Sequence, residues 1–141
     1  MNWKLVFGLS LFGMAMAIGT VFLIPANVEP IFWVAVFLLS ALLIAKKAPS
    51  RRFLHGLMTG IANSVWITAA HVLLFSRYIA NHPQEQAMMS SMPLRNSPRI
   101  MMTLVGPVIG VVSGAIIGGL ALVIARFVSD RKAAKSTPLM P

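Results

Sequence analysis

The sequence predicts an all-α integral membrane protein, built as a bundle of four transmembrane helices. Of its 141 residues, 57% are hydrophobic and only 11% are charged, whereas a soluble domain carries roughly a quarter charged residues. The hydrophobic residues gather in four runs, each long enough to cross a hydrocarbon core of roughly 30 Å. The predicted transmembrane domain covers residues 1–128, and residues 129–141 are expected to form a basic, disordered cytoplasmic tail.

The first predicted span covers residues 4–24 and stops before Pro25. A cleaved signal peptide is the competing interpretation, because Lys4 precedes the run and Ala15-Met16-Ala17 resembles a cleavage site. The apolar run continues for seven residues after Ala17, and cleaved signals rarely do so. This length favours a helix that is retained in the membrane.

The second predicted span covers residues 29–46 and follows a short link. Asn27 is the expected cap, with Glu29 and Pro30 in the first turn, where an acid and a proline are both tolerated. The rest of the segment is apolar on all sides, which is typical of a helix that faces lipid.

The third and fourth predicted spans cover residues 52–80 and 98–128. Ser50 is the expected cap of the third, and Ser97-Pro98 is a typical opening for the fourth. Pro107 lies inside the fourth span, where the loss of a backbone hydrogen bond predicts a kink near Thr103.

The basic residues predict the orientation. Nine fall on the side that holds the termini and three on the side of the 81–97 connection. By the positive-inside rule, both termini face the cytoplasm, as in a bacterial-type inner or plasma membrane. The nine are Lys4, Lys46, Lys47, Arg51, Arg52, Arg126, Arg131, Lys132 and Lys135, and the three are Arg77, Arg95 and Arg99.

Small residues recur every four positions in the last two spans, in the pattern of a glycine zipper. Such stripes leave grooves in which two helices can approach closely. They therefore predict that the third and fourth spans pack together, or alternatively that they form a subunit interface. The fourth span contributes Gly106, Gly110, Gly114 and Gly118, and the third contributes Gly56, Gly60, Ser64 and Thr68.

The third span also carries polar side chains at membrane depth. His55, Thr59 and Asn63 are spaced by four, and His71 follows roughly 80° further around the helix. One interpretation is a proton or ligand path formed by Thr59, Asn63, His71 and Ser113 of the fourth span. The other is hydrogen bonding across helices, to a backbone carbonyl or to Ser113. No charged residue lies deep in a span, which weakens a cation-coupled transport mechanism.

The connection after the third span is rich in methionine. It could form a short surface helix between Pro83 and Pro93, with its methionines in the membrane interface. Alternatively, thioethers and an imidazole could hold Cu(I), and zinc is less suited because few ligands are present. The candidate metal ligands are His82, Met88, Met89 and Met92.

The composition excludes several functions. There is no cysteine, and no phosphate-binding loop, dinucleotide fingerprint or hydrolase motif occurs. With only three acidic residues, neither enzymatic acid–base catalysis nor a cofactor is expected. The net charge of +9 is assigned to orientation and anionic headgroups, not to nucleic acid.

Three functions remain open. The first is an accessory subunit of a membrane complex, which binds other subunits or itself through its glycine-rich faces. The second is a small homo-oligomeric channel or transporter with a polar path along the third span. The third is copper handling by the outer loop.

Overall fold

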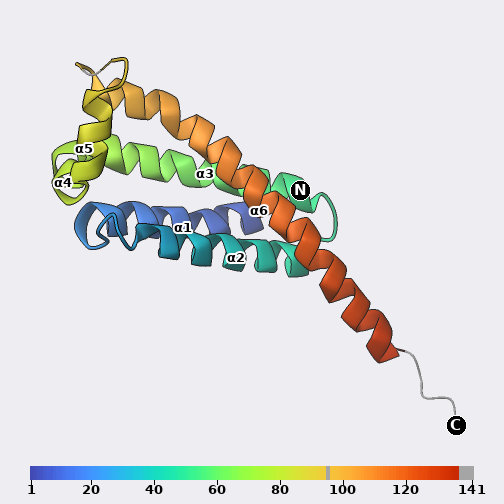
Figure 1. Cartoon of the computed structure of the whole chain (residues 1–141). Coiled ribbons are helices and arrows are strands. Elements are labelled where there is room, and N and C mark those ends of the chain that lie inside the picture. Colours follow the sequence, from blue (N-terminus) through green and yellow to red (C-terminus); the bar gives the residue numbers. More distant parts are fainter. Residues whose placement is uncertain (95, 137–141) are drawn as a thin grey trace, which may run out of the picture.

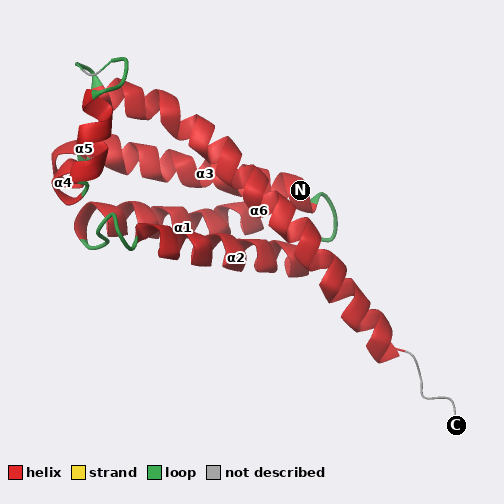
Figure 2. Cartoon of the chain, viewed as in Figure 1, coloured by secondary structure: helices red, strands yellow, loops and turns green. Residues whose placement is uncertain are grey.

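The computed structural model describes residues 1–94 and 96–136, with side chains in the last helix as far as Val128. This part of the chain is helical and contains no strand, which confirms the predicted fold class (Figure 2). Four helices are long and apolar enough to span a membrane. The helices are α1 (Trp3–Phe22), α2 (Glu29–Lys47), α3 (Arg52–Leu73), α4 (Phe75–Asn81), α5 (Pro83–Ser90) and α6 (Pro98–Ser136).

Helices α1, α2 and α3 run side by side, and α6 crosses them diagonally (Figure 1). The most extensive contact is between α3 and α6, followed by α1 with α3 and α2 with α6. We call the end of this array that holds Trp3, Lys47 and Arg52 the basic end. The opposite end, where α4 and α5 lie, is the loop end (Figure 1).

The helix starts differ from the predicted caps. Glu29 and Pro30 lie in the first turn of α2 as expected, but the cap position is Val28 and not Asn27. Ser50 does not cap α3 either, because Arg51 takes that position with a left-handed φ of 51°. Such a backbone is uncommon outside glycine. Here the Arg51 carbonyl accepts hydrogen bonds from both the backbone and the side chain of His55.

The third predicted span does not run unbroken to residue 80. It ends at Leu73, Leu74 interrupts it, and α4 follows. The break turns Tyr78 and Ile79 inward, where they form a small buried cluster with Val21 of α1. Burial of these side chains offsets the loss of continuous helical hydrogen bonding.

The fourth candidate span is Pro98–Val128, as predicted. Helix α6 contains Pro107 and continues to Ser136, so its last turns extend past the basic end (Figure 1). The predicted disorder from residue 129 therefore does not hold as far as Ser136, and residues 137–141 lie outside the described residues. At the loop end, α5 forms between the two prolines as expected.

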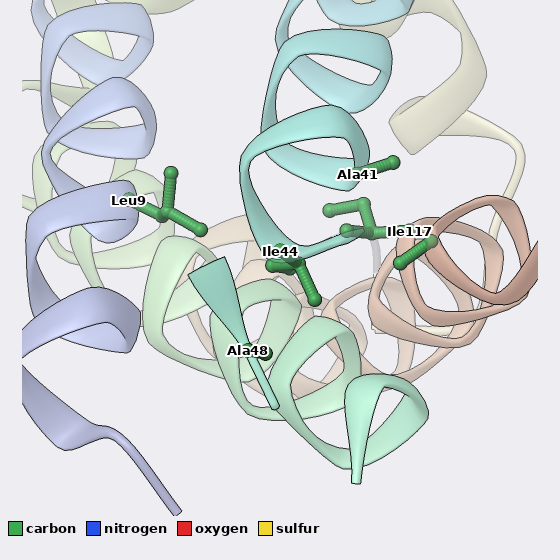
Figure 3. Close-up of a cluster of buried hydrophobic side chains, with 6 residues drawn as sticks. Leu9, Ala41, Ile44, Ala48 and Ile117 are labelled. Carbon is green, nitrogen blue, oxygen red and sulfur yellow. The ribbon is translucent and has the colours of Figure 1, made fainter. Parts of the chain in front are cut away.

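The main hydrophobic core lies toward the basic end, where α1, α2 and α6 meet (Figure 3). Small side chains of α2 allow α6 to approach closely at this point. The core consists of Leu9, Ala41, Ile44, Ala48, Ile117 and Ala121.

Candidate functional site

The glycines of α6 lie against α3. A side-chain carbon added to Gly60 would collide with the backbone of Gly114, and one added to Gly56 would collide with Gly118. The two helices therefore touch through their backbones, as the small-residue stripes require. Nearer the loop end, Gly110 lies against Ser64 and Gly106 lies against Thr68.

This contact occupies the predicted interaction faces within one chain. All four glycines of the α6 stripe have atoms of α3 where a side chain would begin. By contrast, added carbons on Gly8 and Gly119 would meet nothing within 4 Å. The stripe is therefore covered by α3 of the same chain.

Two polar side chains of α3 are fully used inside the protein. His55 Nδ1 donates to the Arg51 carbonyl at 3.0 Å, and Nε2 accepts from the backbone N–H of Asn2 at 2.9 Å. This pattern fixes a neutral imidazole that ties the start of α1 to the start of α3. Thr59 is completely buried and donates to the His55 carbonyl at 2.8 Å. Neither residue lines the cavity described below.

Asn63 differs from these residues. Its side chain packs against Gly13 of α1 and the residue is only 3% exposed. Neither Oδ1 nor Nδ2 has a hydrogen-bond partner among the described residues. A buried polar group without a partner costs roughly 1–3 kcal/mol, so such an amide indicates a place where a water or ligand completes the hydrogen bonding.

Asn63 lines a cavity of about 470 Å³ in the half of the molecule nearer the loop end. Asn63 and Ser113 lie at mid-helix, whereas Glu29 and Glu85 lie toward the loop end. The walls are mainly apolar. Further lining residues are Trp33 and Phe37 of α2, Ser64, Ile67, Thr68 and His71 of α3, Tyr78 of α4, Met88, Met89 and Met92, and Met101, Met102, Val105, Gly106, Ile109 and Gly110 of α6.

Three rings form a stack beside this cavity. The ring of His71 lies 3.7 Å from that of Tyr78, which lies 4.3 Å from the ring of His82. His71 Nε2 is 2.9 Å from the hydroxyl of Thr20 on α1. His71 therefore bonds across helices, as one interpretation predicted, but to Thr20 of α1 and not to a backbone carbonyl or Ser113. Ser113 donates to the Gly110 carbonyl of its own helix.

The stack ends on a carboxylate. Trp33 Nε1 donates to one oxygen of Glu29 at 2.8 Å, and His82 Nε2 lies 3.0 Å from the other. His82 Nδ1 is 3.0 Å from the Tyr78 carbonyl, which can only accept, so Nδ1 bears a hydrogen. One more proton must lie between His82 Nε2 and Glu29. The pair is therefore neutral as a whole, whichever partner holds that proton.

The phenol of Tyr78 stays protonated at physiological pH. Burial raises its pKa above the ordinary value, and the carboxylates of Glu85 and Glu29 raise the pKa further. The phenol therefore serves the cavity as a neutral hydrogen-bonding group and an aromatic face.

The proposed metal ligands are only partly brought together. Met88, Met89 and Met92 line the cavity, joined by Met101 and Met102. His82 is fully buried, with both ring nitrogens within hydrogen-bond distance of other groups. It is thus unavailable to a metal beside the methionines. Among the described residues, no group of three or more His, Cys, Asp or Glu side chains could hold a metal.

Sequence reasoning missed two residues of the site, Glu29 and Tyr78. Glu29 was interpreted only as a first-turn acid, and Tyr78 was assigned no role in the site. The available signal was the scarcity of acidic side chains, three in the whole chain. Nothing local indicated that Tyr78 would turn inward, because this depends on the helix break at Leu74.

Comparison of the chain with protein-family models, with curated proteins and with solved structures found no match. The function must therefore be argued from the cavity and the contacts around it.

Proposed function

We propose that this protein is a small membrane carrier, which binds a mainly apolar molecule in the cavity between α2, α3 and α6. The observation that supports it most directly is Asn63, a buried amide on the cavity wall with no hydrogen-bond partner. A polar group in hydrocarbon is usually functional unless it bonds within the protein. The cavity volume of about 470 Å³ falls within the roughly 300–1,000 Å³ typical of small-molecule sites.

The proposed binding cavity is not a continuous pore along all four residues of the polar path predicted from the sequence. Asn63, His71 and Ser113 line the cavity, but Thr59 is sealed in protein. Toward the basic end, α3 and α6 are in backbone contact and the core around Ile44 is buried. A molecule bound here would enter from the loop end or from the side. We propose that this end faces outward, since nine of the twelve basic residues are on the opposite side.

The accessory-subunit hypothesis has less support. It depended on glycine-rich faces for partners, and the glycines of the α6 stripe are occupied by α3. Between Leu104 and Val123, the exposed side chains of α6 are apolar, as on a helix in contact with lipid.

Photolabelling tests the proposed function. The protein is placed in lipid nanodiscs with a neutral alkyl diazirine probe that carries one amide group, and labelled residues are identified by mass spectrometry. We expect labelling of Trp33 and Met92 to saturate with probe concentration, whereas labelling of the exposed residue Val65 should rise linearly. Asn63→Leu should weaken the saturable labelling on the order of tenfold, since it removes the only buried amide of the wall.

Val65→Leu is the matched control, because it changes a lipid-facing position of the same helix two residues away. Val65→Leu should leave the saturable labelling of Trp33 and Met92 unchanged. Linear labelling of the cavity residues in the unmodified protein would contradict a binding site. If other chains also co-purified stoichiometrically in mild detergent, the accessory-subunit hypothesis would replace it.

A further inference from the structure

The charges around the cavity are the reverse of those of the whole protein. The chain has a net charge of +9, with 12 Lys and Arg against 3 acidic residues. Two of those three acids, Glu29 and Glu85, line the cavity. No Lys or Arg of the described residues lines it. Acidic side chains without basic ones favour a cation over an anion in the cavity.

The two acids do not contribute equally. Glu29 accepts from Trp33 and shares a proton with His82, so that pair has no net charge. Glu85 is half-buried on α5, close enough to the Tyr78 phenol to raise its pKa. Glu85 is therefore the group that gives the cavity its negative charge.

The walls suit a bulky cation. Trp33, Phe37 and Tyr78 present aromatic rings, which attract a cation placed over their faces. Five methionines supply a polarizable surface that adapts to irregular apolar groups. An independent feature lies at mid-helix, where the Asn63 amide is 3% exposed and has no partner. Its oxygen lies against Gly13 of α1, and its amide dipole can orient a bound polar group.

We propose that the molecule bound in the cavity is a lipophilic organic cation, an ammonium or phosphonium with aromatic or alkyl substituents. Its substituents contact the aromatic and methionine walls, and its charge lies toward Glu85. This assignment rests on the proposed function and names the ligand class of the same site.

Two ions of similar shape and opposite charge test the assignment. Binding of tetraphenylphosphonium and of tetraphenylborate is measured by equilibrium dialysis in a non-ionic detergent, with empty micelles subtracted. Without lipid, no headgroup can compete or supply the cation. We expect saturable binding of the phosphonium at one per chain and none of the borate. The phosphonium should also suppress the saturable photolabelling of Trp33 by the neutral probe.

Glu85→Gln should weaken phosphonium binding about tenfold or more, because it removes a carboxylate near the cation and keeps its shape. The matched control combines Glu85→Gln with Gln84→Glu. Gln84 is exposed and does not line the cavity, so this double variant restores the net charge at a neighbouring position. It should bind as weakly as Glu85→Gln alone, and a thermal unfolding curve confirms that both variants are folded.

Each result separates the two proposals. Equal binding of borate and phosphonium, or of borate alone, would overturn the cation assignment and leave the carrier function standing. Full rescue by Gln84→Glu would overturn the role of Glu85, since general surface charge would then explain the attraction. Saturable labelling by the neutral diazirine probe that the phosphonium does not suppress would likewise contradict the assignment of the ligand as a cation. Absence of any saturable binding would overturn both.

Discussion

Helices α2 and α6 meet at the basic end and separate at the loop end, and side-chain size along α2 explains the difference. Near the basic end α2 presents Ala41, Ile44 and Ala48 to Ile117 of α6, and the interior is filled. Toward the loop end, α2 presents Trp33 and Phe37, and a cavity separates the two helices. One half of the molecule is thus a closed scaffold and the other an open site.

The two halves are also held together differently. The closed half is stabilised by backbone contact and dispersion between close-packed atoms. The open half depends on the stack of His71, Tyr78 and His82 and on the bond from His82 to Glu29. The buried His55 and Thr59 of the closed half are bonded within the protein, whereas Asn63, Tyr78 and Glu85 line the cavity of the open half.

The largest loss of stability should come from Gly114→Leu, which disrupts the helix packing of the closed half. A side-chain carbon at Gly114 would lie 2.5 Å from the Leu57 carbonyl oxygen, so the helices must separate. We expect a loss of about 4 kcal/mol or more and aggregation on size-exclusion chromatography. Gly8→Leu is the control, because that position is exposed and open. Normal behaviour of Gly114→Leu would show that the α3–α6 contact is not essential.

The second-largest loss of stability is expected for a substitution in the open half. His82→Phe keeps a ring on Tyr78 but removes both hydrogen bonds, including the one to Glu29. We expect it to cost about 1–3 kcal/mol in thermal unfolding, because Glu29 loses a buried partner. A double-mutant cycle with Glu29→Gln measures the coupling between the two side chains. Additive effects would mean that the bond does not hold α2 to α4.

Asn63→Leu should have opposite effects on stability and on binding. Leucine has no polar atoms to leave unsatisfied, so we expect stability to rise by about 1 kcal/mol while the saturable labelling weakens on the order of tenfold. A fall in stability with normal labelling would indicate that Asn63 has a structural partner and no role in the site.

Adjacent glycines of α6 provide a smaller and sharper test of the closed half. Gly118→Ala introduces a carbon 2.6 Å from the Phe53 carbonyl oxygen, whereas the carbon of Gly119→Ala meets nothing within 4 Å. We expect Gly118→Ala to lower the unfolding temperature. Gly119→Ala should raise stability by about 0.5–1 kcal/mol through helix propensity. If both variants changed the unfolding temperature in the same direction, this packing of α6 against α3 would be refuted.

The smallest effect is expected for the methionines. Met88, Met89 and Met92 changed together to leucine preserve volume, so stability should change by less than about 1.5 kcal/mol. Cu(I) retained after dialysis should be the same in both proteins, because His82 is engaged elsewhere. Copper bound by the unmodified protein and lost in the variant would restore the metal hypothesis.

The sequence by itself determined the all-α class and the four candidate spans, because hydrophobic length is a local property of the chain. The small-residue stripes on α3 and α6 could likewise be read from spacing alone, and the structure places them in contact. Periodicity placed His55, Thr59 and Asn63 together on α3, but it could not distinguish the satisfied residues from the unsatisfied one.

Only the tertiary structure decided the site. The break at Leu74 turns Tyr78 between two histidines that are eleven residues apart in sequence. Glu29 reaches His82 from another helix, and Asn63 faces a glycine of α1 that offers no hydrogen bond. These contacts depend on which helices pack together and on where along their axes they meet. Packing across the whole protein fixes both, so no single segment of the sequence encodes them.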